Sequence, residues 1–548
     1  MTSPAKPTPS RFGSESIMQR ALWWQTGVIY QIYPRSFQDS SGDGIGDLRG
    51  IMQRLPYLVE LGVDAIWLSP IFPSPMVDFG YDISDYTGID PLFGSLDDFD
   101  ALLQAAHAQG LRVILDLVPN HTSDQHPWFR ESRASRQSPK RDWYIWRDPA
   151  ENGGPPNNWL SEFGGSAWKY DRASGQFYYH AFHAAQPDLN WRNPAVRSAI
   201  YEVMRFWFRR GVDGFRVDVI WHLIKDDRFR DNPPNPAFQA GDPPHHRLTP
   251  LYTVDRPEVH DVIAEMRRVA DGFSDRVLIG EIYLPFERLV AYYGRDLAGV
   301  HLPFNFSLLS ATWHAPSIAR LIGEYEAALP AGGWPNWVLG NHDRPRIASR
   351  VGPDQARIAA MLLLTLRGTP TIYYGDEIAM NEVAIAPDQV RDPLGKSAAR
   401  PLGRDGCRTP MRWDATRHAG FSTTEPWLPL DGASDASNVV VQRRDKGSMY
   451  QLYRRLIELR RKRTALLLGG YGSVLADGNL LVFTRESGRE RILVALNFDG
   501  EATAVSLASG ELAGRLLISS AGDREDEPVR GSVKLRPHEG VVVDVQPR

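Results

Sequence analysis

Eight short apolar segments alternate with stretches of helical pattern along the first 375 residues of the chain. The segments are rich in Val and Ile and are bounded by Gly, Pro or polar residues, which is typical of strands buried in a parallel sheet. Between two of them, residues 95–110 combine a Ser cap, an apolar face and a terminal Gly, as a helix would. Eight strands that alternate with helices predict an α/β fold, a (β/α)8 TIM barrel with its active site at the carboxyl ends of the strands. The segments are Gly27–Tyr33, Val63–Ser69, Leu111–Pro119, Val212–Val219, Val277–Ile282, Gly299–Phe304, Trp337–Asn341 and Thr371–Gly375.

Three further stretches depart from this alternation. Residues 121–190, after the third strand, and 378–427, after the eighth, are rich in Gly and Pro and too long for ordinary loops. Both follow strand carboxyl ends, so we expect them to wall in a pocket there. After residue 467 the pattern changes to alternating strands with turns, which predicts an antiparallel β domain. We therefore expect a disordered arm at 1–20, the barrel at 21–120 and 191–467, an inserted domain at 121–190 and a C-terminal β-sandwich at 468–548.

The composition argues against several classes of partner. A net charge of −4 gives no support for binding to nucleic acid or to anionic membranes. No apolar run approaches the roughly 18 residues of a membrane span, and the first residues lack the apolar core of a signal peptide. Cys407 is the only cysteine, so no intrachain disulfide can form. We expect a cytoplasmic protein, either a monomer or a homodimer.

Carboxylates and histidines follow several of the predicted strands. Because the carboxyl ends of barrel strands share one rim, these side chains are expected to meet there. A single polar residue at a strand end is often only a helix cap, but three carboxylates and two histidines on one rim are not explained in that way. The groups are Asn120-His121, Arg216-x-Asp218, Glu281 and Asn341-His342-Asp343.

Two of these carboxylates form an opposed pair. Arg216 and Asp218 are two positions apart on a strand, so their side chains share a face, and the guanidinium should lower the pKa of Asp218. Glu281 comes from the neighbouring strand and faces that negative charge in a partly enclosed place, which we expect to keep it protonated as an acid. An ionised carboxylate opposite a carboxylic acid is the arrangement used in glycoside hydrolysis.

Five motifs carry a resemblance to a known family. DLVPNH at 116–121, GFRVD at 214–218, GEI at 280–282 and GNHD at 340–343 resemble the four signature regions of the α-amylase superfamily, glycoside hydrolase family 13. QPDLN at 186–190 resembles the additional signature of its oligo-1,6-glucosidase subfamily. The resemblance extends over nearly the whole chain, in the order and on the strands that the family would require.

The resemblance implies catalytic roles for the matched carboxylates. It makes Asp218 the nucleophile and Glu281 the general acid and base, while Asp343 grips the sugar hydroxyls beside the anomeric carbon. Arg216 would orient the nucleophile. The implied reaction proceeds through a covalent glucosyl ester and releases α-glucose.

The resemblance also implies how glucose is held. His121 and His342 would hydrogen-bond glucose hydroxyls, and Tyr81 would provide a stacking surface. Asp78 and Arg408 would clamp the non-reducing end. A carboxylate and a guanidinium at that end would stop longer chains from passing through, which distinguishes an exo-acting glucosidase from an endo-acting amylase.

The implied function is a retaining exo-acting α-glucosidase that acts on small sugars such as maltose, isomaltose or sucrose, with some transglucosylation. A sucrose or trehalose isomerase, or a dedicated α-glucosyltransferase, would use the same residues. A transporter heavy chain of this superfamily would carry a membrane helix and often lacks the carboxylates. Val219 follows the nucleophile, and in the family Val there tends to accompany α-1,6 cleavage. One side chain changes discrimination by only about 1–3 kcal/mol, so the linkage stays open.

A loop after the first strand has the spacing of a metal site. Oxygen ligands fall at alternate positions, with Gly44 at the turn in the sixth place. The twelfth position is Gly50 instead of the Glu of an EF-hand, so an EF-hand is excluded. Relatives carry a cation here, which implies one structural Ca²⁺ or Mg²⁺, and an Asp/Gly turn without metal is the alternative. We expect no organic cofactor. The proposed ligands are Asp39, Ser41, Asp43, the carbonyl of Ile45, and Asp47.

Overall fold

The computed structural model describes residues 21–396, 403–430, 437–506 and 513–546, so the predicted arm at 1–20 lies outside the described residues. Eight parallel strands form the predicted barrel, in the order β10-β11-β1-β2-β3-β7-β8-β9. A parallel bridge between Asn305 and Trp337 joins the two ends of this order and closes the cylinder. The strands are β1 (Ile29–Ile32), β2 (Ala65–Leu68), β3 (Arg112–Leu117), β7 (Gly214–Val217), β8 (Val277–Gly280), β9 (Leu302–Pro303), β10 (Asn336–Val338) and β11 (Thr369–Tyr373).

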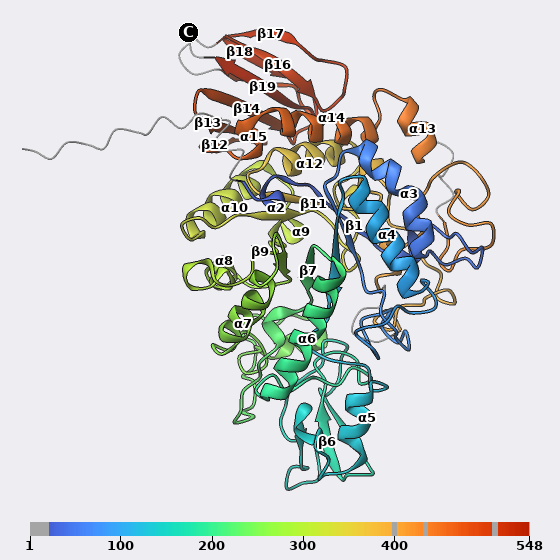
Figure 1. The fold of residues 1–548 in the computed structure, drawn as a ribbon. Coiled ribbons are helices and arrows are strands. Elements are labelled where there is room, and N and C mark those ends of the chain that lie inside the picture. Colours follow the sequence, from blue (N-terminus) through green and yellow to red (C-terminus); the bar gives the residue numbers. More distant parts are fainter. Residues whose placement is uncertain (1–20, 397–402, 431–436, 507–512, 547–548) are drawn as a thin grey trace, which may run out of the picture.

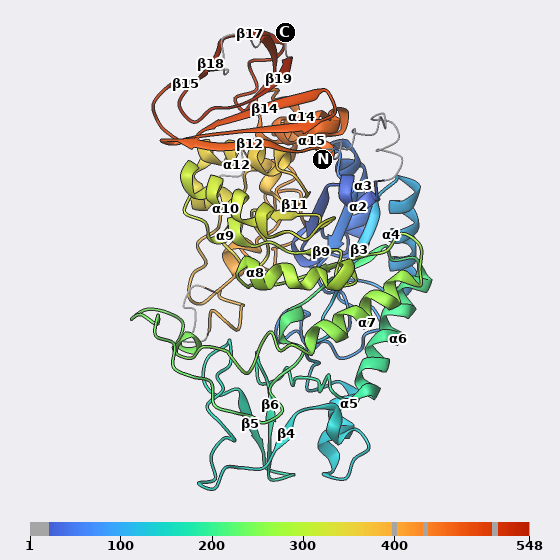
Figure 2. The ribbon, with the colours of Figure 1, turned by 90° about the vertical axis from the view of Figure 1, so that its left-hand side faces the viewer.

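Helices cover the outside of the barrel (Figures 1 and 2). The one predicted over residues 95–110 is α4 (Leu96–Ala108), where Ser95 and Asp98 form a capping box. The main helices of the barrel and its C-terminal flank are α3 (Leu48–Leu61), α4, α6 (Pro194–Arg210), α7 (Val259–Asp271), α10 (Ala315–Ala328), α12 (Pro353–Thr365) and α14 (Met449–Lys462). Shorter helices are α2 (Trp23–Thr26), α5 (Pro127–Ala134), α8 (Phe286–Leu289), α9 (Ser307–Ser310), α11 (Ile347–Val351), α13 (Val439–Arg444) and α15 (Thr464–Leu467).

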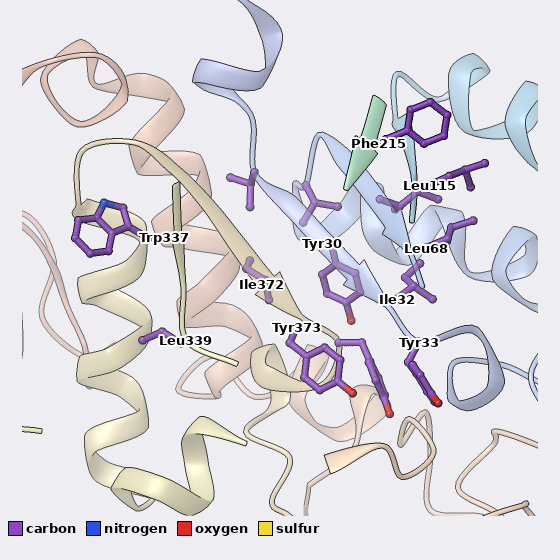
Figure 3. Packing of buried hydrophobic residues seen from close by; sticks show 14 of the residues in the cluster. Tyr30, Ile32, Tyr33, Leu68, Leu115, Phe215, Trp337, Leu339, Ile372 and Tyr373 are labelled. Carbon is purple, nitrogen blue, oxygen red and sulfur yellow. The ribbon is translucent and has the colours of Figure 1, made fainter. Parts of the chain in front are cut away.

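The barrel strands are buried on both faces, which explains their continuous apolar pattern. Inside the cylinder, Trp67 and Ile114 pack with other inward residues of the strands. Alternate residues such as Leu68 and Leu115 point outward into the layer between strands and helices (Figure 3). Side chains alternate between the two faces of each strand. One apolar run therefore fills both the inside of the barrel and the layer between the strands and the helices.

The inserted segment and the C-terminal domain lie at opposite ends of the molecule (Figure 1). The inserted segment contains an antiparallel sheet of three strands, in the order β4-β6-β5. Its strands are β4 (Trp146–Arg147), β5 (Trp168–Asp171) and β6 (Gln176–Tyr179).

The C-terminal domain is an antiparallel sheet of eight strands, in the order β12-β13-β14-β19-β16-β17-β18-β15. All eight strands belong to one continuous hydrogen-bonded sheet. The sequence predicts a β-sandwich, which in its simplest form consists of two separate sheets. Ile492, Val494 and Leu496 face the core that includes α12 and α14, and the alternate residues Leu493 and Ala495 face a separate apolar cluster. The strands are β12 (Gly470–Asp477), β13 (Leu480–Ser487), β14 (Glu490–Asn497), β15 (Thr503–Ser506), β16 (Ala513–Ser519), β17 (Glu527–Arg530), β18 (Ser532–Leu535) and β19 (Gly540–Gln546).

Candidate active site

Most of the side chains predicted to act on substrate line one cavity of about 560 Å³ at the carboxyl ends of the barrel strands. Asp218 directly follows β7, Glu281 directly follows β8, and Asp343 lies in the loop after β10. Arg216 lies beneath the cavity floor, and Arg408 does not line the cavity. The predicted residues that line it are Asp78, Tyr81, His121, Asp218, Glu281, His342 and Asp343.

Arg216 is the centre of a buried group of three carboxyls. Its Nη1 lies 2.7 Å from Asp218 Oδ1 and 2.8 Å from Asp116 Oδ1, and its Nη2 lies 2.6 Å from Glu281 Oε2. The backbone N–H of Val219 also donates to Glu281 Oε2, at 2.9 Å. One guanidinium therefore contacts both members of the opposed pair, and Asp218 and Glu281 are neighbours across it.

The electrostatics of this group differ from the expectation drawn from sequence. Burial raises the pKa of Asp218 well above its usual value; Arg216 opposes this rise, and Glu281 and Asp116 add to it. Burial likewise raises the pKa of Asp116 to about 6. The expectation that Arg216 lowers the pKa of Asp218 overall is wrong, because desolvation outweighs the attraction to one guanidinium.

The far end of the cavity is closed by Arg404, where we expected Arg408. Arg404 Nη2 lies 2.6 Å from Asp78 Oδ1 and 2.8 Å from Asp392 Oδ1, and its Nη1 lies 3.1 Å from Asp343 Oδ1. Arg408 is buried behind Asp343: its Nη2 lies 3.0 Å from Asp343 Oδ1, and its Nε donates to the carbonyl of His342 at 2.7 Å. The guanidinium that lines this end of the cavity beside Asp78 is therefore that of Arg404, whereas Arg408 does not line the cavity and contacts Asp343 and the carbonyl of His342.

Aromatic and imidazole rings form the side walls around the carboxyls. Tyr81 stacks on His342 with ring centroids 5.2 Å apart and planes 5° from parallel. The Nε2–H group of Gln31 points at His342 Nδ1 at 2.8 Å, so Nδ1 accepts and Nε2 carries the ring proton. Burial lowers the pKa of His342 to about 3 and also lowers that of His121. Both imidazoles are therefore neutral hydrogen-bonding groups at neutral pH.

The inserted segment contributes contacts that the sequence analysis did not assign. Gln186, the first residue of the QPDLN motif, donates from Nε2 to Asp78 Oδ2 at 3.1 Å. Asp188 of the same motif accepts from Asn120 Nδ2 at 2.8 Å and pairs with the buried ammonium of Lys225. The structure thus shows that this motif ties the inserted segment to the end of the cavity formed by Asp78.

The loop with the spacing of a metal site is held by its own backbone. Asp39 Oδ1 accepts from the amide of Gly42 at 2.7 Å and Asp39 Oδ2 from that of Gly44 at 2.8 Å, while Asp47 Oδ1 accepts from the amide of Gly50 at 2.7 Å. Over the described ranges, no group of three or more His, Cys, Asp or Glu side chains is placed to hold a metal. The oxygen-only donors suit a hard cation such as Ca²⁺. The metal site therefore stays a prediction.

Comparison with known proteins agrees with this geometry. Residues 31–469 match the family model described as alpha amylase, catalytic domain, and residues 473–542 match that of the maltogenic amylase C-terminal domain. The chain belongs to the alpha-amylase catalytic domain family. It is 44% identical over 502 residues to a probable alpha-glucosidase of Rhizobium meliloti (strain 1021), covering 88% of this chain and 91% of the relative. It is 38% identical over 566 residues to the oligo-1,6-glucosidase of Parageobacillus thermoglucosidasius, covering 96% and 99%.

Among solved structures, this member of the alpha-amylase family is similar to the alpha-glucosyl transfer enzyme XgtA. The TM-score is 0.91 and the identity 40%, over 96% of this chain and 100% of that one. In the described part of the chain, no helix is long and apolar enough to cross a membrane.

Proposed function

We propose that the protein is a retaining exo-acting α-glucosidase that removes terminal α-linked glucose from disaccharides and short oligosaccharides. The observation that carries this proposal is the combination of an opposed carboxyl pair with a cavity closed at one end. Asp218 and Glu281 share Arg216, and the Asp78–Arg404 pair stands where a longer glucan would have to continue. A glucose unit bound between them would present only its anomeric carbon to the carboxyls.

In the proposed mechanism Glu281 is the general acid and supplies the proton that the leaving group needs. Glu281 donates this proton to the glycosidic oxygen while Asp218 attacks the anomeric carbon and forms a β-glucosyl ester. Glu281 then takes a proton from water, whose oxygen attacks the same carbon and releases α-glucose. Arg216 contacts both carboxyls, so it can stabilise the charge on whichever of them is ionised at each step.

Transfer of glucose to a second sugar is the alternative outcome of the same ester. The similarity to an alpha-glucosyl transfer enzyme over nearly the whole chain favours some transfer by this protein. Hydrolysis results when water reaches the ester first, and transfer results when a hydroxyl of an acceptor sugar does. Isomerisation of sucrose or trehalose would use the same residues, with the released sugar as the acceptor. A structural cation in the loop at 39–47, a cytoplasmic location, and a monomeric or homodimeric state stay predictions.

A panel of maltose, isomaltose, sucrose, trehalose and soluble starch, followed by NMR, tests the proposal. We expect α-glucose as the first product from one or more of the disaccharides, with little cleavage of starch. Release of β-glucose, or internal cleavage of starch as the main reaction, would contradict retaining exo action. The ratio of new glucosides to free glucose measures transfer in the same spectra.

A further inference from the structure

A second cavity, of about 770 Å³, lies beside the inserted segment and shares no lining residue with the active-site cavity. Trp146 and Arg147, the two residues of β4, line it from the inserted segment (Figure 2). Further lining residues fall at 190–194, where α6 begins, and at 225–229 in the loop after β7. A ligand in this cavity would therefore contact both the inserted segment and the barrel.

Cations outnumber carboxylates in the walls of this cavity. Five cationic and three carboxylate side chains line it, although the whole chain has a net charge of −4. The carboxylates are Asp142, Asp226 and Asp227, and Asp226 pairs with Arg230 at 2.6 Å. The excess of positive charge favours an anionic ligand. The cations are Arg136, Arg141, Arg147, Arg192 and Lys225.

Three of these cations are paired with carboxylates, and two are not. Within the described part of the chain, no carboxylate lies within ion-pair distance of Arg141 or Arg147. Asp171, whose charge acts on Arg141, is itself held by Arg133 at 2.9 Å. Two guanidiniums are therefore left for a ligand. The paired cations are Arg136 with Asp148, Arg192 with Glu258, and Lys225 with Asp188.

Arg141 is held in a fixed orientation on an aromatic ring. Its Cζ lies 3.5 Å from the centroid of the Trp146 ring. Its Nη1 donates to the carbonyl of Ser132 at 3.1 Å, and its Nη2 donates to Gln176 Oε1. Each Nη carries two hydrogens, so these two bonds leave one N–H on each nitrogen for another acceptor. Burial lowers the pKa of Arg141 to about 10, and an anion beside the guanidinium would offset that loss of hydration.

Arg147 is held on a second ring and can be reached from solvent. Its Cζ lies 3.7 Å from the centroid of the Phe229 ring, in the loop after β7. Its Nη1 donates to the carbonyl of Trp146 at 2.8 Å. The side chain is exposed, so a dissolved ligand has access to it. Both guanidiniums are thus positioned before any ligand arrives, which reduces the entropy that binding would cost.

We propose that this cavity binds a phosphate group, either free phosphate or the phosphate of a small sugar ester, through Arg141 and Arg147. A guanidinium presents parallel N–H groups that match two phosphate oxygens. A phosphate has three acceptor oxygens and nearly two negative charges at neutral pH, so one phosphate can serve two guanidiniums. The cavity is larger than a bare phosphate ion, so it also has room for a sugar. The inference does not depend on the proposed α-glucosidase function, because the two cavities share no residue.

Isothermal titration calorimetry of the full chain with inorganic phosphate, glucose 6-phosphate and glucose tests this site. We expect saturable binding of both phosphate compounds that weakens as salt is added. Arg141→Gln and Arg147→Gln should each weaken it about 10- to 100-fold, the effect of losing a hydrogen bond between charged groups. Tighter binding of glucose 6-phosphate than of phosphate would identify a sugar ester as the ligand, and equal affinities would identify the phosphate group alone. Any binding of neutral glucose should be the same in all variants.

Arg172→Gln is the matched control. Arg172 is an exposed arginine of the same segment that lines neither cavity, so its loss removes the same charge and should leave phosphate binding unchanged. Thermal unfolding without ligand shows which variants are folded. Because Arg147 is exposed, Arg147→Gln decides the question if Arg141→Gln is unstable.

The inference would be overturned if the wild type bound neither phosphate compound, or if Arg147→Gln kept the wild-type affinity. An equal loss of affinity in Arg172→Gln would overturn it as well, because the effect would then be one of overall charge. Calorimetry measures binding without turnover, so a failure of the proposed α-glucosidase function would be seen separately, in the substrate panel.

Discussion

Neutralising the charges at the closed end of the cavity tests whether Arg404, and not Arg408, forms the proposed clamp on glucose. The perturbation is Asp78→Asn and Arg404→Gln, made singly and together. Arg404 Nη2 lies 2.6 Å from Asp78, and the exposed fractions of the two residues are 8% and 5%. At a pair this buried, water cannot replace a lost ionic partner without a cost in free energy. Each single substitution should therefore have a large effect.

The size of the expected effect depends on which hydrogen-bond and ion-pair partners each carboxylate keeps in the variant. Removing one partner of a buried ion pair costs about 3–5 kcal/mol. Asp78 retains the hydrogen bond from Gln186 at 3.1 Å, so we place the loss at the lower end. That cost concerns the stability of the fold; for substrate, a lost hydrogen bond to a charged group is worth about 1.5–3 kcal/mol, so we expect kcat/KM to fall roughly 10- to 100-fold. Asp392 is fully buried and also pairs with Arg404, so Arg404→Gln should reduce the free energy of unfolding as well.

A double-mutant cycle on kcat/KM for an aryl α-glucoside separates these contributions. We expect a coupling of about 2–3 kcal/mol between positions 78 and 404, since the double variant loses little beyond the worse single one. Arg408→Gln combined with Asp78→Asn should show a weaker coupling, because Arg408 is linked to Asp78 only through Asp343 and Arg404. Thermal unfolding of each variant ensures that rates are read from folded protein. The proposed clamp of Asp78 and Arg404 would be refuted if position 78 coupled as strongly to 408 as to 404, or if it coupled to neither.

The remaining predictions concern catalysis, pH and the metal loop. Asp218→Asn and Glu281→Gln should each reduce turnover of an aryl α-glucoside by several orders of magnitude with an unchanged unfolding curve, and near-normal rates in either would contradict the proposed mechanism. The pKa of Asp218 is raised, chiefly by burial but also by Asp116, and ionised Asp218 is required, so kcat/KM falls as pH drops through this pKa. Asp116→Asn removes one of the raising charges, so the acid limb of the profile should move to lower pH; a shift to higher pH would refute this. If the loop at 39–47 binds a cation, EDTA should lower Tm, and Ca²⁺ at 100 times its dissociation constant should restore about 2.7 kcal/mol in the wild type but much less in Asp43→Asn. Identical unfolding curves of the wild type in EDTA and in Ca²⁺ would argue against a bound metal ion.

The barrel could be predicted from the sequence because its strands are buried on both faces. That burial requires continuous apolar runs, and the runs at 63–69 and 111–119 each contain an observed strand, β2 and β3. The run at 299–304 contains β9, which is only two residues long. The arrangement of the C-terminal strands could not be predicted, because alternation shows which face of a strand is buried but not which strands are neighbours.

The position of the catalytic carboxyls could be predicted, but their electrostatics and the clamp could not. Strand ends share one rim, so Asp218 and Glu281 had to be close in a barrel. The clamp depends on a loop in which Arg404 and Arg408 are four residues apart, and the short helix at Asp405–Cys407 between them decides which guanidinium enters the cavity. The sign of the pKa shift of Asp218 depends on the depth of burial, which no motif reports.

Asp218 and Asp343 form ion pairs of similar length with arginines, but their pKa values shift in opposite directions, and the number of guanidiniums beside each carboxyl explains the difference. Arg216 alone serves Asp116, Asp218 and Glu281, so burial prevails and the pKa of Asp218 is raised. Burial also opposes ionisation of Asp343, but the guanidiniums of Arg404 and Arg408 both contact it and lower its pKa. A carboxylate that accepts hydrogen bonds from sugar hydroxyls has to stay ionised. A pair of carboxyls that exchanges a proton with substrate needs one member that carries a proton. Under the proposed function, the second guanidinium beside Asp343 favours the ionised carboxylate that binding needs, whereas Asp218 has one guanidinium partner among the described residues.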